Sequence, residues 1–153
     1  MKRVIAILLF VIAALLAVIL FRGRTPPSEI DRNRAFEQSM SGVTLQGNST
    51  RLDREGMFGP EQYHIDGVTH VSGDTWLFRT RMKLGDKEIP VPIPLSVKWA
   101  GDTPVITLTD LAIPGVGTYS ARVVLYRNQY SGTWNGATEG GQLFGKIVRQ
   151  NVR

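Results

Sequence analysis

The sequence predicts an all-β protein in which an N-terminal membrane helix and a short α-helix precede an eight-stranded antiparallel up-and-down barrel. Three observations support this prediction. The run Val4–Phe21 has no charged or polar side chain. From Val43 onward apolar side chains recur at every second position, which is the period of a β-strand. Turn residues divide this region into eight short segments, and a meander of that size hides its edges by closing into a barrel.

The run Val4–Phe21 is long enough to cross a membrane. As a helix it would reach about 27 Å, close to a hydrocarbon core of roughly 30 Å. Residues 1–24 are therefore a membrane anchor or uncleaved signal. A cleaved secretory signal is the alternative, because Lys2 and Arg3 supply the positive start that such a signal needs, but no clean small-residue cleavage pair follows. Either interpretation exports the C-terminal domain to the periplasmic or extracellular side of a cell membrane.

The charge distribution argues against nucleic-acid binding. The chain has a net charge of +5, with 18 basic and 13 acidic residues. Four of the basic residues flank the apolar run: Lys2, Arg3, Arg22 and Arg24. Without these four, 14 basic residues face 13 acidic ones, so the exported part is close to neutral and lacks a basic footprint for nucleic acid. No cysteine is present, which excludes disulfides and a lipid-modified cysteine.

Residues 25–42 are predicted to form a linker and a short helix. Pro26 and Pro27 stop any continuation of the membrane helix. Ser28, three residues before Asp31, starts a helix of about 29–40 in the manner of a capping box. The helix has a thin apolar stripe, which we expect to cover a barrel mouth or a sheet face: Ile30, Phe36 and Met40. The alternative is an interfacial membrane helix.

Residues 43–153 are predicted to form the antiparallel β-barrel domain. We expect strands at about 43–48, 61–70, 75–84, 88–99, 103–110, 118–127, 129–135 and 141–149. The clearest alternation begins at Trp76, where Trp76 and Phe78 lie on one face and Arg79 and Arg81 on the other.

The strand at 88–99 contains Pro90, Pro92 and Pro94. Its alternate residues are apolar: Val91, Ile93, Leu95, Val97 and Trp99. Residues two apart in a strand direct their N–H groups to the same edge, and proline has no N–H. One edge therefore lacks three successive donors, which predicts a seam, a protected edge or a barrel open at this strand. The alternative is a polyproline II ligand for a partner's aromatic groove.

No catalytic residue, metal site or cofactor is predicted. The chain has no Gly-x-Ser-x-Gly elbow, no cysteine nucleophile and no phosphate-binding loop, and its carboxylates are scattered. His64, Asp66 and His70 resemble the start of a two-His, one-carboxylate iron site. On a continuous strand, however, the two histidines would be about 20 Å apart at ~3.3 Å per residue.

The Gly132-Thr133-Trp134 segment and the glycine-rich segment from Gly140 to Gly145 resemble the calycin or lipocalin pattern and the endings of small exported bacterial barrel proteins. The resemblance implies a lipocalin-like barrel whose base is closed by Trp134 under a basic side chain, here Arg127 or Arg149. In lipocalins this motif lies near the first strand, whereas here it lies on the penultimate one.

The sequence favours a binding or interaction module of the cell envelope. A small hydrophobic ligand is expected inside the barrel, next to Trp134, where Ala121 and Gly132 leave room. The expected ligand-binding residues are Trp76, Phe78, Val91, Ile93, Leu95, Trp99, Tyr119, Tyr130 and Trp134. The alternative is a structural or assembly protein that binds an envelope partner through Arg79, Arg81 and Lys83 or through the proline-rich edge. A second alternative is an enzyme of unknown reaction.

The membrane anchor leads to a first test. Because no small-residue cleavage pair follows Val4–Phe21, the mature protein should keep its amino terminus and stay with membranes after an alkaline carbonate wash. Recovery of a soluble species beginning between Arg22 and Ser28 would instead identify a cleaved signal.

Overall fold

The structure is a computed structural model that describes residues 27–84, 87–113 and 117–150. The predicted membrane run Val4–Phe21 lies outside these residues. Within the described part, no helix combines the length and the apolar character needed to cross a membrane. Two compact units are distinguished, Met1–Arg32 and Asn33–Arg153.

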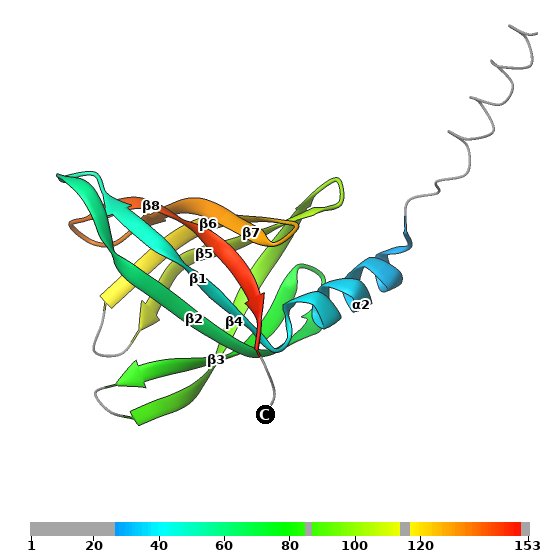
Figure 1. The fold of residues 1–153 in the computed structure, drawn as a ribbon. Helices are drawn as coiled ribbons and strands as arrows, with labels where there is room; N and C mark the ends of the chain where they lie inside the picture. Colours follow the sequence, from blue (N-terminus) through cyan, green and yellow to red (C-terminus); the bar gives the residue numbers. More distant parts are fainter. Residues whose placement is uncertain (1–26, 85–86, 114–116, 151–153) are drawn as a thin grey trace, which may run out of the picture. The chain divides into compact units, whose positions relative to one another are not determined.

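Eight antiparallel strands form a closed barrel in which each strand pairs with its neighbours in sequence and β8 returns to β1 (Figure 1). The prediction of an up-and-down barrel of eight strands is therefore confirmed. One helix, α2, precedes the barrel. The elements are α2 (Glu29–Met40), β1 (Val43–Arg51), β2 (Arg54–Ser72), β3 (Thr75–Leu84), β4 (Lys87–Ala100), β5 (Thr103–Ile113), β6 (Gly117–Tyr126), β7 (Gln129–Asn135) and β8 (Gly140–Arg149).

The second strand starts earlier than predicted, at Arg54 instead of near residue 61. The sequence around Gly56 and Pro60 indicated a loop, since both residue types interrupt strands. In the structure β1 and β2 remain paired there because a register shift between Asn48 and Ser49 accommodates the irregularity, and Gly56 adopts a φ of 103°. The first hairpin is consequently longer than the sequence indicated.

The first turn of α2 lies in the unit Met1–Arg32 and is capped as predicted. The backbone N–H of Asp31 donates to the Ser28 hydroxyl oxygen at 3.2 Å, and that hydroxyl donates to the Asp31 carboxylate at 2.6 Å. This pair satisfies one of the amides that a helix start leaves without a partner.

The second half of α2 closes one end of the barrel. The Phe36 ring is 4% exposed and packs edge-on against Trp76, with ring centroids 4.8 Å apart. It also contacts Trp99 at 5.6 Å and Phe78 at 6.4 Å. Met40 is buried beside it. These inward aromatic side chains and the helix residues therefore form one continuous core.

Polar contacts fix this half of the helix to the barrel rim. The Arg149 guanidinium donates to the carbonyl oxygens of Gln38 at 3.0 Å and Ser41 at 2.8 Å, which helps satisfy the exposed carbonyls at the helix end. The Glu37 carboxylate accepts a hydrogen bond from the His70 backbone N–H at 2.6 Å.

The prolines of β4 limit its pairing to one side. The backbone N–H of Val97 donates to the Asp74 carbonyl oxygen on the β3 side of the strand. The N–H groups of odd-numbered β4 residues therefore point toward β3. Pro90, Pro92 and Pro94 occupy positions whose N–H groups would point toward β5. Pairing with β3 runs from Leu84↔Lys87 to Thr75↔Ser96. Pairing with β5 is described only from Ser96↔Thr107 to Ala100↔Thr103. The predicted seam is present, but the expectation of an open barrel is wrong, because these five pairs close it.

The β3–β4 hairpin consequently diverges from the barrel at its far end. The described ladder between β2 and β3 ends at His64↔Arg81, and that between β4 and β5 starts only at Ser96. Beyond these points the two strands pair with each other alone, as their separation from the β1–β2 hairpin in Figure 1 shows.

The contact of Phe36 with the aromatic core gives a second test. Phe36→Ala should lower the free energy of unfolding by ~3–5 kcal/mol, because it removes a buried ring and leaves a cavity. Urea unfolding measures the change. Ile30→Ala on the same helix is the matched control, since Ile30 is 70% exposed, and it should change stability by less than ~0.5 kcal/mol. Equal tolerance of both substitutions would contradict the role given to α2.

Candidate ligand-binding site

The nine side chains predicted to bind a ligand fall into three groups. Residues paired across an antiparallel ladder share a face, and the pairs place all nine on the inner face. Trp76, Phe78 and Tyr130 are buried in the core. Leu95, Trp99 and Trp134 are partly buried against it. The remaining three are half-buried: Val91, Ile93 and Tyr119.

Trp76 and Phe78, which lie next to α2, line no open surface. Phe36 occupies the space between Trp76, Phe78 and Trp99. A ligand between these three rings would have to displace the Phe36 ring. The protein itself therefore fills this part of the interior.

A pocket of about 380 Å³ lies where β4 and β5 separate. It is lined by Pro94, Leu95, Ser96, Thr107, Leu108, Thr109 and Leu111. The pocket begins at the last pair of the ladder, Ser96↔Thr107. It is thus the direct result of the proline edge, which offers no N–H donors to β5.

The β5 side of this pocket is held against β6. Asp110 adopts a φ of 49°, and its backbone N–H donates to the Ser120 hydroxyl oxygen at 2.9 Å. The Arg122 guanidinium donates to the Leu108 carbonyl oxygen at 2.6 Å and to the Thr109 hydroxyl at 3.0 Å. A register shift between Leu108 and Leu111 accompanies these contacts. The separation of β5 from β4 is therefore built into the strand.

One row of inward positions connects this pocket to Trp134. Leu108 pairs with Ala121, and Ala121 pairs with Trp134. The small Ala121 side chain lies between the two larger ones. The expectation of room at Gly132 is wrong, because a Cβ added there would overlap the Arg122 carbonyl oxygen. Close approach of the neighbouring strand explains this glycine.

A polar cluster lies on the inner face of β1 and β2. Gly47 pairs with Glu61 and Leu45 with Tyr63, so these positions share the face of the buried Leu45. The Ser49 hydroxyl donates to the Glu61 carboxylate at 2.5 Å, and the Tyr63 hydroxyl donates to its other oxygen at 2.7 Å. Ser49 is buried, whereas Tyr63 is 43% exposed. The exposure of an inward tyrosine follows from the divergence of β3 from β2.

Tyr130 approaches this cluster from β7. Tyr130 pairs with Gly145, and Gly145 pairs with Gly47 on β1. Its hydroxyl occupies the space that a Cβ at Gly47 would need. The residue is 2% exposed, and its hydroxyl has no hydrogen-bond partner among the described residues. Because Gly47 and Gly145 have no side chains, the buried Tyr130 side chain can extend toward Glu61.

Both tyrosines are held in the neutral form. Burial, then the hydrogen bond to Glu61 and its charge, raise the pKa of Tyr63 well above the ordinary value of about 10. Burial and then the charge of Glu61 also raise the pKa of Tyr130. Each phenol therefore keeps its proton across the physiological range.

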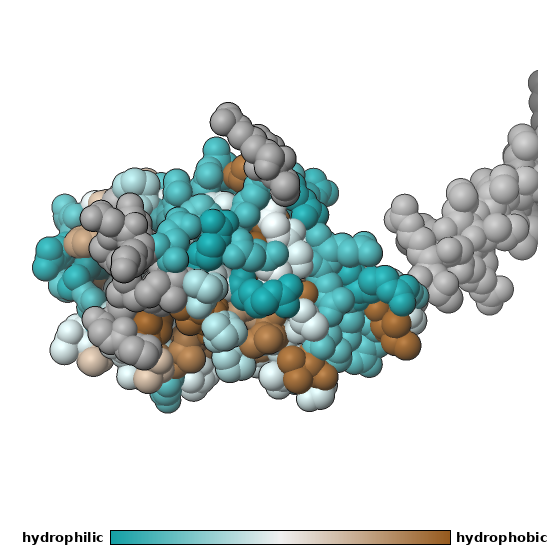
Figure 2. Space-filling view, turned by 90° about the horizontal axis from the view of Figure 1, so that it is seen from below, coloured by the Kyte–Doolittle hydropathy of each residue, from teal (hydrophilic) through white to brown (hydrophobic). Residues whose placement is uncertain are grey.

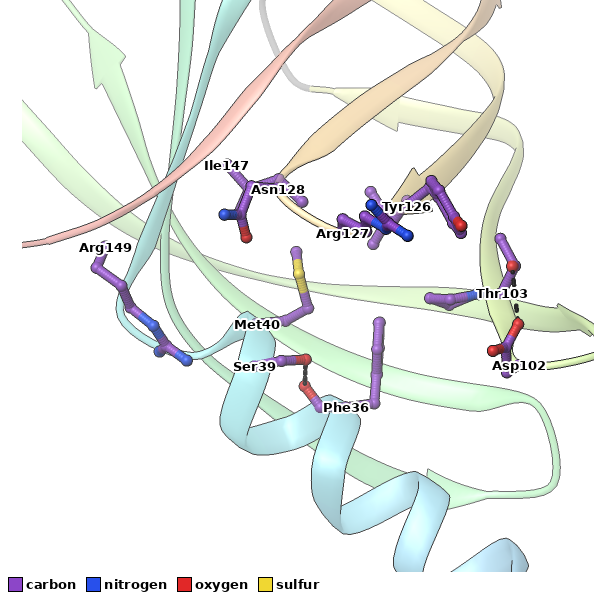
Figure 3. Close-up of a pocket in the computed structure, with 12 residues that line it drawn as sticks. Phe36, Ser39, Met40, Asp102, Thr103, Tyr126, Arg127, Asn128, Ile147 and Arg149 are labelled. Atoms are coloured by element: carbon purple, nitrogen blue, oxygen red, sulfur yellow. Dashed lines mark hydrogen bonds between the residues drawn. The ribbon is translucent and has the colours of Figure 1, made fainter. Parts of the chain in front are cut away.

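A second pocket, of about 490 Å³, lies beside α2 (Figure 3). Phe36 and Met40 point toward it from the helix, opposite the β6–β7 turn with Arg127 and Asn128. Arg149 at its edge is engaged with carbonyl oxygens of the helix end. This pocket follows from the packing of the helix on the rim.

Several predicted features have other roles. Arg81, one of the basic residues proposed to bind a partner, pairs with Asp66 at 2.9 Å and with Glu88 at 3.0 Å. Neither Arg127 nor Arg149 makes a described contact with Trp134; Arg127 lies over the Tyr126 ring, 5.3 Å from its centroid.

The histidines have separate partners. His64 contacts the Thr44 hydroxyl at 3.0 Å, and His70 contacts the Gly73 carbonyl oxygen at 2.9 Å. In the part of the chain that the structure describes, no three potential metal ligands lie together.

Comparison with known proteins yields no match: no protein-family model, curated protein or solved structure corresponds significantly to this chain. The likeness to lipocalins therefore stays a prediction from the sequence.

The sequence interpretation missed Ser49, Glu61 and Tyr63. A signal for two of them was present, because Glu61 and Tyr63 occupy the same alternate positions of β2 as the buried Ile65.

The tyrosine pKa values give a third test. When folding raises the pKa of a group, its contribution to stability is complete at pH values below its pKa in the unfolded state. This contribution is lost as the pH rises above that pKa. Wild-type protein should therefore lose stability above about pH 10. Urea unfolding between pH 7 and 11.5 should show a smaller loss in Tyr63→Phe and in Tyr130→Phe. Tyr126→Phe, at an exposed position, should show the same dependence of stability on pH as the wild type. The same dependence in all four proteins would contradict the raised pKa values of Tyr63 and Tyr130.

Proposed function

We propose that the chain is a membrane-anchored β-barrel module of the cell envelope that binds a small, largely apolar ligand. Residues 4–21 would anchor it in the membrane, with the barrel outside the cytoplasm. The ligand would enter between β4 and β5 and extend toward Trp134. The observation that carries the proposal is the pocket of about 380 Å³ at the proline edge.

Three properties of this pocket support binding. Its inward side chains are apolar, namely Leu95, Leu108 and Leu111. Its opening is fixed, because the prolines prevent β4 from pairing with β5 along this stretch. Its volume falls within the usual range of small-molecule sites, roughly 300–1,000 Å³.

Strand addition is the second candidate, since β5 from Leu108 to Ile113 has no described partner on the β4 side. A partner's extended segment could pair with this edge in a structural or assembly role. A large apolar docking surface does not accompany it on the face shown in Figure 2, where hydrophobic residues lie in small groups among hydrophilic ones. We therefore favour the small ligand.

The test uses the full chain in lipid nanodiscs and 1-hexanol, a neutral probe short enough to stay in water. Titration should quench or shift tryptophan fluorescence, because Trp134 lies in the row that starts at Leu108. Leu111→Gln should weaken binding about tenfold by placing an amide among the inward leucines of the pocket. Ala112→Gln, at the exposed neighbouring position, is the matched control and should bind as wild type.

A well-folded protein with no response to the probe would refute binding of a neutral apolar ligand. Equal responses of the Leu111 and Ala112 variants would show that the probe binds elsewhere. Empty nanodiscs give the background from partition into lipid.

A further inference from the structure

Glu61 is a charged group without a charged partner among the described residues. Its carboxylate oxygens receive hydrogen bonds from two neutral hydroxyls, those of Ser49 and Tyr63. Two other carboxylates of the barrel, those of Asp66 and Glu88, have a cationic neighbour in Arg81. A partly buried carboxylate is costly unless a charge or several hydrogen bonds compensate it. The inner face of the barrel thus holds a negative charge that no cation among the described side chains neutralises.

The Tyr130 hydroxyl is a second, independent sign of an absent partner. The side chain is buried, yet this hydroxyl has no described hydrogen-bond partner. Buried polar groups are nearly always hydrogen-bonded, and an exception in a folded protein calls for an explanation. The hydroxyl lies over Gly47, the position paired with Glu61. A polar ligand group placed between them would satisfy both.

We propose that Glu61, with Tyr63 and Tyr130, binds the ammonium group of an organic amine whose apolar body occupies the barrel. This inference rests on the proposed binding function and adds the charge of the ligand to it. The neutral phenols contribute oxygen acceptors, and their rings offer faces that attract a cation.

The geometry favours an organic cation over the other charge classes. An anion would meet the charge of Glu61 with no cationic side chain described beside it. Calcium takes six to eight oxygen ligands and magnesium requires an octahedral set, whereas this cluster supplies one carboxylate and three hydroxyls. An ammonium group needs only two or three acceptors and forms strong, charge-assisted hydrogen bonds with a carboxylate.

Access to Glu61 is provided by the same divergence that forms the pocket. The β3–β4 hairpin separates from β2 after His64↔Arg81 and from β5 before Ser96↔Thr107. The two gaps flank one hairpin, and Tyr63 is exposed at the first of them. A ligand behind this hairpin would present its apolar body to Leu95 and Leu108 and its amine to Glu61.

The test compares three probes that share a six-carbon chain: hexylammonium, 1-hexanol and hexanoate. Isothermal titration calorimetry of the full chain in nanodiscs, with empty nanodiscs as the blank, gives each affinity. Wild type should bind hexylammonium roughly tenfold or more tighter than hexanol, and hexanoate most weakly, because a hydrogen bond to a charged group exceeds a neutral one.

Glu61→Gln keeps the side-chain shape and removes the charge. It should lower the affinity for hexylammonium by roughly tenfold to a hundredfold while hexanol binding changes less than about twofold. Glu55→Gln, an exposed carboxylate on the same strand, is the matched control and should leave all three affinities unchanged. Tyr130→Phe should weaken hexylammonium binding a few-fold without lowering stability in urea, because the lost hydroxyl has no partner within the described chain.

Each outcome decides between the two proposals. If hexanol binds but hexylammonium gains nothing over it, or if Glu61→Gln leaves the preference intact, the amine site is refuted and the pocket at the proline edge survives. If hexylammonium alone binds, and does so through Glu61, the amine site stands and binding of a neutral ligand is refuted. If no probe binds to folded protein, both proposals fail.

Discussion

The absence of three backbone donors on one edge of β4 determines much of this architecture. A barrel requires each strand to hydrogen-bond on both sides, and Pro90, Pro92 and Pro94 have nothing to donate toward β5. Closure is therefore left to the short ladder that begins at Ser96. The pocket between the strands and the divergent β3–β4 hairpin both follow from this single constraint. A feature that would weaken an ordinary sheet here makes part of the interior accessible.

The two ends of the barrel have different roles. At one end Phe36 from α2 completes an aromatic core. At the other, Ser49, Glu61 and Tyr63 bring polar groups to the inner face, where an apolar core would be more stable. Natural proteins tend to have residues that do not favour stability at the sites where they bind ligands or catalyse reactions. The filled end can supply the stability that the polar end lacks.

Sequence reasoning predicted the fold better than the site. The alternation around Trp76 and the turn residues sufficed for strand number, order and most boundaries, because each depends on nearby residues. The same was true of the Ser28 cap and of the proline edge. The roles of Trp76 and Trp99 were not predictable, because they depend on Phe36, which lies far away in the sequence. The cluster at Glu61 likewise forms only through the pairing of β1 with β2 and β8.

The two glycines beneath Tyr130 also have a consequence for how the barrel finds its closure. Strands β1 and β8 come from opposite ends of the domain, so no short turn sets their alignment, and a slip by one residue would reverse every side chain. Gly47 and Gly145 are opposite each other, and a Cβ at either would overlap the neighbouring backbone. A slipped pairing would bring side chains such as Gln46 or Phe144 to that crossing. The Tyr130 side chain and the close backbones at Gly47 and Gly145 thus exclude other residues sterically, which selects the native alignment of β1 with β8.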